Sequence, residues 1–309
     1  MSKPPMPIFM FFGIAGGATC SCVENDQLFV GSQTGVVKIF GIKSKLIEGI
    51  VYEDKEERRI QSLEFSKNLL YIYVRNFAVL QLKRHENSAK EWEITLTVEV
   101  DHVGFCNSII VGSKLLFPST DVQRYSTLCW TDLSEVNVKA KQITEHPDIA
   151  PMCMLFRDEE EEEVLIGMED GCLAISSENC GGFEFQTTMK LGREPVFCIA
   201  SCSKWVAAGC SRSPIFLINR NDLSKQEIPY LPDAGGCSAI AFSTNTKQVL
   251  AGFWDGSIRV FSRLRLTVLL VLSHSHSSTI SSLHWSPSEY GDLMIATSSD
   301  STVTMWKLK

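Results

Sequence analysis

Two pairs of residues have types and spacings that raise the question of metal chemistry. His274 and His276 are separated by one residue, and Cys20 and Cys22 show the same spacing. Imidazoles and thiolates are common zinc ligands, but a zinc site needs further ligands at compatible spacing, and none is evident. The sequence also lacks a phosphate loop, a dinucleotide fingerprint, a His-Glu-x-x-His motif and a nucleophile elbow. We therefore expect no enzyme activity, no catalytic residues, no metal site and no cofactor.

A repeated pattern indicates which elements organise the polar residues. Residues 298–306 and 253–261 both read as a polar turn, then alternating apolar residues, then an aromatic. Upstream segments such as 280–286 and 237–243 alternate apolar and polar residues, which is typical of half-buried strands. A strand, a turn and a further strand at this period are the signature of a WD40 unit, a blade of four strands.

The same pattern recurs along the whole sequence and predicts seven units. The second unit, at 75–80, is degenerate, and the third lies near 120–123 with an unclear register. The expected third strands end near residues 40, 81, 126, 176, 218, 261 and 306. The steps of about 41 to 50 residues are close to a WD40 period of ~40–45. No segment keeps a helical period over three turns, so we expect an all-β fold.

The last unit lacks residues for a fourth strand after Trp306, whereas Ile8–Phe12 is a strand candidate without a unit. The simplest arrangement lets this N-terminal strand complete the last blade, which avoids an open seam. We therefore predict a seven-bladed WD40 β-propeller, with the ring closed by the N-terminal strand. The seven blades use the whole chain, so we expect a single domain over residues 1–309.

Several polar residues have a predicted structural role within this repeat. His276 precedes the strand beginning at Ile280 at the distance where WD40 units place a histidine that hydrogen-bonds within the blade. We expect its network to include Ser298, Asp300 and Trp306, although the participating serine or threonine is not fixed by the sequence. Such a buried polar network helps to specify the blade.

The turn at Trp254, Asp255 and Gly256 contains one candidate binding residue. Asp255 and Gly256 are expected to form a tight structural turn, because glycine tolerates positive φ. Trp254 just before them is either a surface anchor for a partner or a side chain packed under a neighbouring turn. The sequence leaves these two alternatives open.

The sharpest charge feature is a run of six carboxylates at residues 158–163. Adjacent carboxylates repel one another and cannot be buried together, so the run is expected to form a hairpin loop. We favour a merely solvated loop over a docking site for a basic partner. The candidate partner-binding residues of this run are Glu159, Glu160, Glu161, Glu162 and Glu163.

Composition limits the classes of partner and of cell compartment. The net charge of −7 argues against a general nucleic-acid binder, and no segment approaches the length of a membrane span. Eleven cysteines without regular spacing, many at apolar strand positions, favour a reducing compartment. The apolar stretch at 6–18 only faintly resembles a signal peptide, because prolines shorten it. We expect a cytoplasmic and nuclear protein that binds neither nucleic acid directly nor membranes.

Three segments carry a more particular resemblance. Residues 103–110, 151–154 and 251–261 resemble the guanine nucleotide-binding protein subunit beta-like protein 1 family, called ASTRA-associated protein 1 in fungi. The Gly-Ser-Gln-x-Gly turn at Gly31–Gly35 also follows that family's order of segments. The resemblance to heterotrimeric G-protein beta subunits is one of fold. Because no long coiled-coil helix precedes the first blade, we expect no pairing with a G-protein gamma subunit.

The resemblance implies a non-enzymatic adaptor. Its expected partners are components of the TTT co-chaperone complex, phosphatidylinositol 3-kinase-related kinases and the Hsp90 machinery. The alternative is a WD40 scaffold or substrate receptor in a ubiquitin-ligase or signalling complex. A propeller enzyme comes third, because such enzymes gather carboxylates or metal ligands at the central channel, and equivalent repeat positions contain no suitable set.

Overall fold

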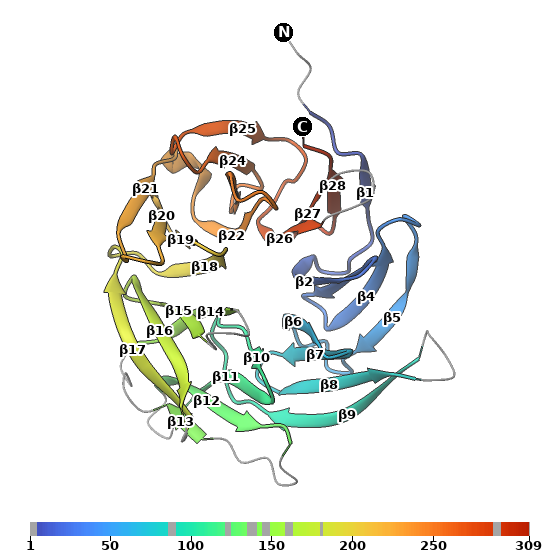
Figure 1. The fold of residues 1–309 in the computed structure, drawn as a ribbon. Helices are drawn as coiled ribbons and strands as arrows, with labels where there is room; N and C mark the ends of the chain where they lie inside the picture. Colours follow the sequence, from blue (N-terminus) through green and yellow to red (C-terminus); the bar gives the residue numbers. More distant parts are fainter. Residues whose placement is uncertain are drawn as a thin grey trace. The chain divides into compact units, whose positions relative to one another are not determined.

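The computed structural model describes residues 5–85, 91–120, 125–134, 141–143, 149–157, 163–179, 182–286 and 292–308. Almost all regular structure in these residues is β-strand (Figure 1). The only helical element among them is one 3-10 turn, η1, at Pro232–Ala234. None of the described residues belongs to a helix with the length and apolar character needed to cross a membrane.

The strands form seven antiparallel sheets of four strands each within the described residues. The chain divides into two compact units, Met1–Ile60 with Ala200–Lys309, and Gln61–Ile199, and each unit is described here by itself. The expectation of a single domain stays a prediction.

In the first unit, consecutive strands pair within each sheet, apart from β1, which joins the last sheet. The sheets are β2 (Ala18–Glu24), β3 (Gln27–Ser32), β4 (Val36–Gly41) and β5 (Ile47–Glu53); β18 (Val196–Ser201, which begins before the unit boundary), β19 (Trp205–Cys210), β20 (Ile215–Asn219) and β21 (Lys225–Ile228); β22 (Cys237–Phe242), β23 (Gln248–Phe253), β24 (Ile258–Ser262) and β25 (Val268–Leu272); and β26 (Ile280–Ser286), β27 (Leu293–Ser298), β28 (Val303–Trp306) and β1 (Phe9–Phe11).

The second unit contains three sheets of the same kind. They are β6 (Ile60–Ser66), β7 (Leu69–Val74), β8 (Ala78–Arg84) and β9 (Trp92–Glu99); β10 (Ile109–Val111), β11 (Lys114–Thr120), β12 (Ser126–Asp132) and β13 (Lys141–Ile143); and β14 (Pro151–Arg157), β15 (Glu163–Met168), β16 (Cys172–Asn179) and β17 (Gly182–Lys190).

Burial follows the position of a strand within its sheet. The second strand of a sheet, such as β23 with Val249 to Phe253, is buried on both faces and reads as a continuous apolar run. The outermost strands, such as β21 and β25, are largely exposed. Strands covered on both faces lose the alternating pattern, whereas one-sided strands keep it. The repeat is therefore recognised from its turns and inner strands rather than from its outer strands.

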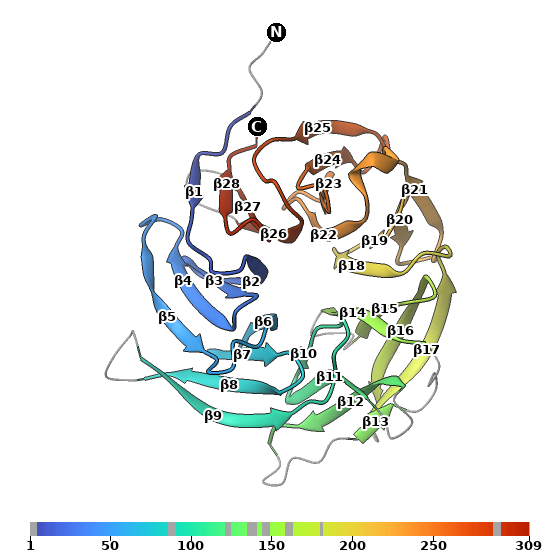
Figure 2. The same cartoon turned by 180° about the vertical axis from the view of Figure 1, so that it is seen from behind.

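The N-terminal strand β1 completes the last sheet, as predicted. Phe9 pairs with Met305 and Phe11 pairs with Val303 in antiparallel register. Phe11 is only 4% exposed, and its ring lies 4.9 Å from that of Phe40. Figures 1 and 2 both show β1 beside β28. Burying these aromatic side chains favours the pairing by a few kcal/mol at most per ring.

The third sheet differs from the sequence prediction. Its third strand was expected near residues 120–126, but β12 runs from Ser126 to Asp132. Thr120 instead ends β11 and pairs with Ser126, so the connection between the two strands falls where the strand had been placed. The apolar run at 128–130, buried in the structure, is the third strand's true centre. Residues 121–124 lie outside the described part of the chain.

A β-bulge near the start of a first strand recurs in several sheets. Register shifts occur at Thr19 in β2 and at Ser238 in β22. The side chain of the extra residue donates to a neighbouring segment: Thr19 donates to the carbonyl of Ile60 at 2.6 Å, and Ser238 donates to that of Ile280 at 2.7 Å. Bulges re-aim side chains in this way. Within the first unit, Ser238 therefore links the sheet of β22 to the sheet of β26.

Candidate partner-binding surfaces

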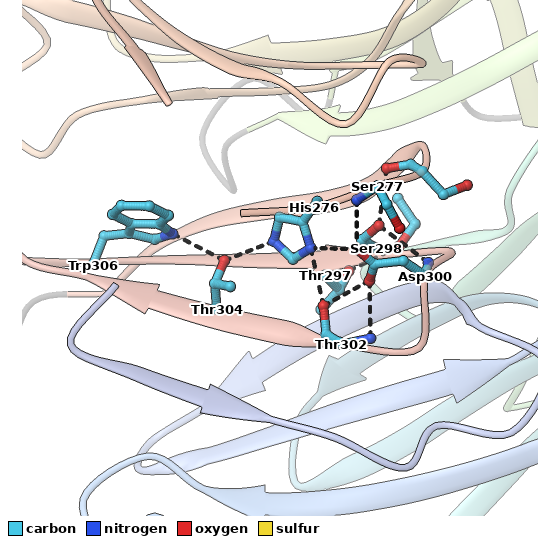
Figure 3. A network of polar contacts seen from close by, with 10 residues as sticks. His276, Ser277, Thr297, Ser298, Asp300, Thr302, Thr304 and Trp306 are labelled. Atoms are coloured by element: carbon cyan, nitrogen blue, oxygen red, sulfur yellow. Dashed lines mark hydrogen bonds and ion pairs between the residues drawn. The ribbon is translucent and has the colours of Figure 1, made fainter. Parts of the chain in front are cut away.

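The predicted histidine network is present at one end of the last sheet (Figure 3). His276, in the connection between β25 and β26, lies with Nδ1 3.1 Å from the Asp300 carboxylate and 3.0 Å from Thr302 Oγ1. Its Nε2 lies 2.7 Å from Thr304 Oγ1, and the Trp306 indole donates to the same hydroxyl at 2.9 Å. One orientation satisfies the chain: the indole donates to Thr304, Thr304 donates to Nε2, and Nδ1 donates to Asp300.

Asp300 ties this network to the neighbouring turn. Its carboxylate accepts hydrogen bonds from the Ser277 amide at 2.9 Å and from the Thr302 hydroxyl at 2.6 Å. Burial opposes ionisation, but these hydrogen bonds outweigh it and hold the pKa of Asp300 below its ordinary value. For His276, burial disfavours the charged form and so lowers the pKa. Ser298 Oγ donates to the Ser278 carbonyl at 2.9 Å.

The hydrogen-bonding groups of His276 and Thr304 are used within the network. Both nitrogens of His276 are engaged, and Thr304 is fully buried. Thr302 and Thr304 are the hydroxyl partners that the sequence could not choose, because any nearby serine or threonine has the required chemistry. We call His276, Ser298, Asp300, Thr304 and Trp306 the turn cluster; its geometry stabilises the fold.

The turn with Trp254 lies beside this cluster. Asp255 Oδ1 accepts a hydrogen bond from the Ser257 amide at 2.8 Å, and Gly256 has a φ of +82°. A Cβ at Gly256 would lie 2.7 Å from the His276 carbonyl oxygen, so glycine is required there. A polar cavity of about 540 Å³ lies between these turns and includes His274 in its lining.

Trp254 combines the two alternatives that the sequence left open. Its indole is 42% exposed. The covered part lies against the backbone of Gly235 and Gly236, and a Cβ at Gly236 would be 2.6 Å from the ring. The two glycines therefore make room for the indole.

The acidic run falls mostly outside the described residues. Glu159, Glu160, Glu161 and Glu162 lie outside them, so their predicted role stays a prediction. Glu163 is the first residue of β15 and pairs with Arg157 of β14 in antiparallel register. That pairing makes β14 and β15 a hairpin, with residues 158–162 as its connection.

The second unit contains a larger cavity, of about 770 Å³, which we call the loop groove. Its lining comes from the loop Asp101–Phe105 between β9 and β10, from Thr120 and Ser126 at the end of the β11–β12 pair, and from Ala150–Met152 with Glu169. Site prediction from the sequence missed this cavity, although 103–110 and 151–154 had been singled out for their resemblance.

Two side chains hold the groove's loop by its backbone. The Arg75 guanidinium donates to the Val103 carbonyl and lies 5.9 Å from the Phe105 ring. Gln61 follows Ile60 at the start of β6, as the bulge residue Thr19 follows Ala18 in β2, and it donates to the Phe105 carbonyl at 2.5 Å. The Phe105 side chain itself is 56% exposed and makes an edge contact with Phe197.

A buried histidine forms part of the groove's lining. His102 is 4% exposed, and its Nδ1 lies 3.5 Å from Ser126 Oγ. Among the described residues, its Nε2 has no hydrogen-bond partner. Burial, followed by the Arg75 charge, lowers the pKa of His102 to about 4, so the ring is neutral near pH 7. The groove therefore gains no positive charge from this side chain.

Metal ligands do not gather in the part of the chain that the structure describes. There, no three His, Cys, Asp or Glu residues are grouped so that they could hold an ion. Cys20 is a buried free thiol, and burial raises its pKa to about 12. Cys22 is half-buried. The thiol of Cys20 is thus kept protonated.

Comparison with known proteins identifies the repeat. The family model described as WD domain, G-beta repeat matches residues 230–262 and 267–307. The chain contains WD40 repeats. The two matched WD40 segments cover the Trp254 turn and the whole turn cluster.

The WD40 fold extends over the rest of the chain as well. A chain of the solved structure "Crystal Structure of Mitotic Checkpoint Complex" is similar to this protein with a TM-score of 0.76 and 14% identity. The match covers 100% of this chain and 95% of that chain. At this identity the likeness concerns the fold, which is that of a seven-bladed WD40 β-propeller, as predicted.

Proposed function

We propose that this protein is a non-enzymatic WD40 adaptor that assists the TTT co-chaperone complex and the Hsp90 machinery in the maturation and stability of phosphatidylinositol 3-kinase-related kinases. It would act in the cytoplasm and nucleus through protein contacts alone. WD40 propellers present loops on rigid sheets, and such loops commonly carry binding. The similar chain in the structure of the mitotic checkpoint complex is likewise part of a complex.

One observation carries the proposal. Two of the three segments that resemble the beta-like protein 1 family, 103–110 and 151–154, contribute side by side to the lining of the loop groove. Val103 and Phe105 from the first segment are exposed, although both are apolar. Exposed apolar side chains in a cavity are typical of partner-binding sites. A resemblance that gathers at one surface supports a shared partner.

The proposal is tested by purifying the tagged full-length protein from cells and identifying its partners by mass spectrometry. Recovery of TTT components and large kinases, together with lower kinase levels after depletion of the protein, is the expected result. Recovery of cullin-ligase subunits in their place would contradict it and favour a substrate receptor. A tagged chain with Leu264→Ser, an exposed residue of the first unit, serves as the matched control.

A further inference from the structure

The loop groove contains apolar side chains that the protein covers only in part. Val103 is 62% exposed, whereas Met152, which also lines the cavity, is buried. Exposed apolar area costs free energy in water, at roughly 25 cal/mol per Å². Covering Val103 and Phe105 by a partner would recover part of it. The groove thus offers apolar contact area within a concave lining.

The backbone that presents these side chains is held before any partner arrives. Arg75 fixes the Val103 carbonyl and Gln61 fixes the Phe105 carbonyl, and each comes from a different segment of the second unit. The Glu169 amide donates to the Ala150 carbonyl at 2.9 Å, and this hydrogen bond joins two further residues of the lining. A site that is already ordered spends little conformational entropy on binding.

Charge defines what else the partner must carry. The carboxylates of Asp101 and Glu169 are both exposed and both line the groove. Arg75, which also lies beside this loop, is engaged by the Val103 carbonyl and the Phe105 ring. The groove therefore combines an apolar contact surface with negative charge, and a basic partner complements it.

We propose that the loop groove binds a short segment of a partner protein in which an aromatic or aliphatic side chain is flanked by lysine or arginine. The apolar side chain packs on Val103 and Phe105, and the basic side chains pair with Asp101 and Glu169. This inference rests on the proposed function, since it names the surface through which the adaptor takes its partner.

Three matched fluorescent peptides test this chemistry directly on the purified full-length protein. All have a Gly/Ser background; the first carries a central Phe flanked by Lys, the second the same Phe flanked by Glu, and the third Ser flanked by Lys. Fluorescence anisotropy titrations measure the dissociation constants. The first peptide should bind at least about tenfold more tightly than the other two, a difference typical of one well-packed anchor residue. Equal binding of all three would overturn the proposal.

Variants assign the two halves of the site. Phe105→Ser should lower affinity for the first peptide about tenfold, while Phe105→Leu should retain most of it. Val103→Ser provides a second test should Phe105→Ser lower the melting temperature. Asp101→Asn combined with Glu169→Gln should abolish the preference for Lys over Glu flanks and keep the preference for Phe. Unchanged peptide ranking in these variants would contradict the assignment.

Controls distinguish this inference from the proposed function and from other occupants. Leu264→Ser, on the first unit, should bind all peptides like the wild type. Self-association that Phe105→Ser abolishes, without peptide binding, would show that a second copy occupies the groove and would overturn the proposal. If peptides bind as predicted but cells yield no TTT components, the proposed function fails and the site stands. If TTT components are recovered equally with Phe105→Ser, the site fails and the function stands.

Discussion

Two histidines, one in each unit, occupy comparable places in the repeat and end in opposite situations. His276 precedes the first strand of a sheet and uses both ring nitrogens within the turn cluster. His102 also lies in a connection before a first strand, but its Nε2 has no partner among the described residues, and apolar side chains beside it are exposed. A satisfied buried polar network helps to specify a fold, whereas a buried polar atom without a partner is unusual in a folded protein.

The largest expected effect comes from breaking the turn cluster. His276→Leu leaves the buried Thr304 and the half-buried Asp300 with fewer partners, so the free energy of unfolding should fall by about 3 kcal/mol. Urea denaturation measures the change, with Leu264→Ser as a control that should be neutral. Binding of the Lys-flanked peptide should be unchanged at temperatures where the variant is folded. If the free energy of unfolding fell by less than about 1 kcal/mol, the turn cluster would not be a main stabilising element, and it would not differ from the loop groove in this respect.

The pH dependence of stability sharpens the comparison at His102. Its pKa is lowered to about 4 in the folded state, so between that value and about 6.5 the unfolded state binds more protons. Above pH 6.5 this group therefore does not reduce the free energy of unfolding. As the pH falls from 6.5 towards 4, the free energy of unfolding decreases, by about 2 kcal/mol at pH 5. Asp101 opposes this shift and Arg75 reinforces it.

The measurement compares urea unfolding at pH 7 and pH 5 for the wild type and His102→Gln. The variant should lose about 2 kcal/mol less between the two pH values. His284, whose pKa burial also lowers to about 4, acts in the same direction, and Glu64, whose pKa burial raises to about 8, acts in the opposite direction. Both remain in the variant, so the difference isolates His102. Identical pH dependence in the two proteins would contradict the neutral buried state.

The smallest expected effect is that of Trp254→Ala. Its indole is partly covered by Gly235 and Gly236, so removing it should lower the free energy of unfolding by about 1 kcal/mol. Peptide binding at the loop groove should not change at any salt concentration. A fall in peptide affinity without a change in stability would instead place the partner surface at the Trp254 turn, in the first unit.

The sequence predicted the repeats well where each unit carries its own local signal. Turns such as Asp255-Gly256 recur with fixed spacing, and inner strands are short apolar runs, so local pattern locates both. In the third sheet the register was unclear from the sequence, and the third strand lies later than predicted: Thr120 ends β11, and β12 runs from Ser126 to Asp132. Outer strands gave little signal because much of their surface is exposed.

The loop groove could not be predicted for a different reason. Val103 and Phe105 look like core residues in the sequence. Their apolar side chains do not reveal that distant residues hydrogen-bond to their backbone carbonyls and keep the loop in place. That hold comes from Gln61 and Arg75, which precede the loop by one or more strands. The turn cluster, by contrast, lies within residues 276–306, and its His and Asp appear at recognisable spacing.

The pairing of β1 with β28 sets an order of events during protein synthesis. Phe9 is made early and must wait for Met305 before it acquires its strand partner. Until then β1 can pack on the first sheet, as Phe11 does on Phe40, but it has no strand partner. Closing so long a segment of chain carries an entropic cost that grows with its length. The last sheet is therefore completed only after translation has passed β28, and a ligand that captures residues 9–11 before then would leave this sheet one strand short.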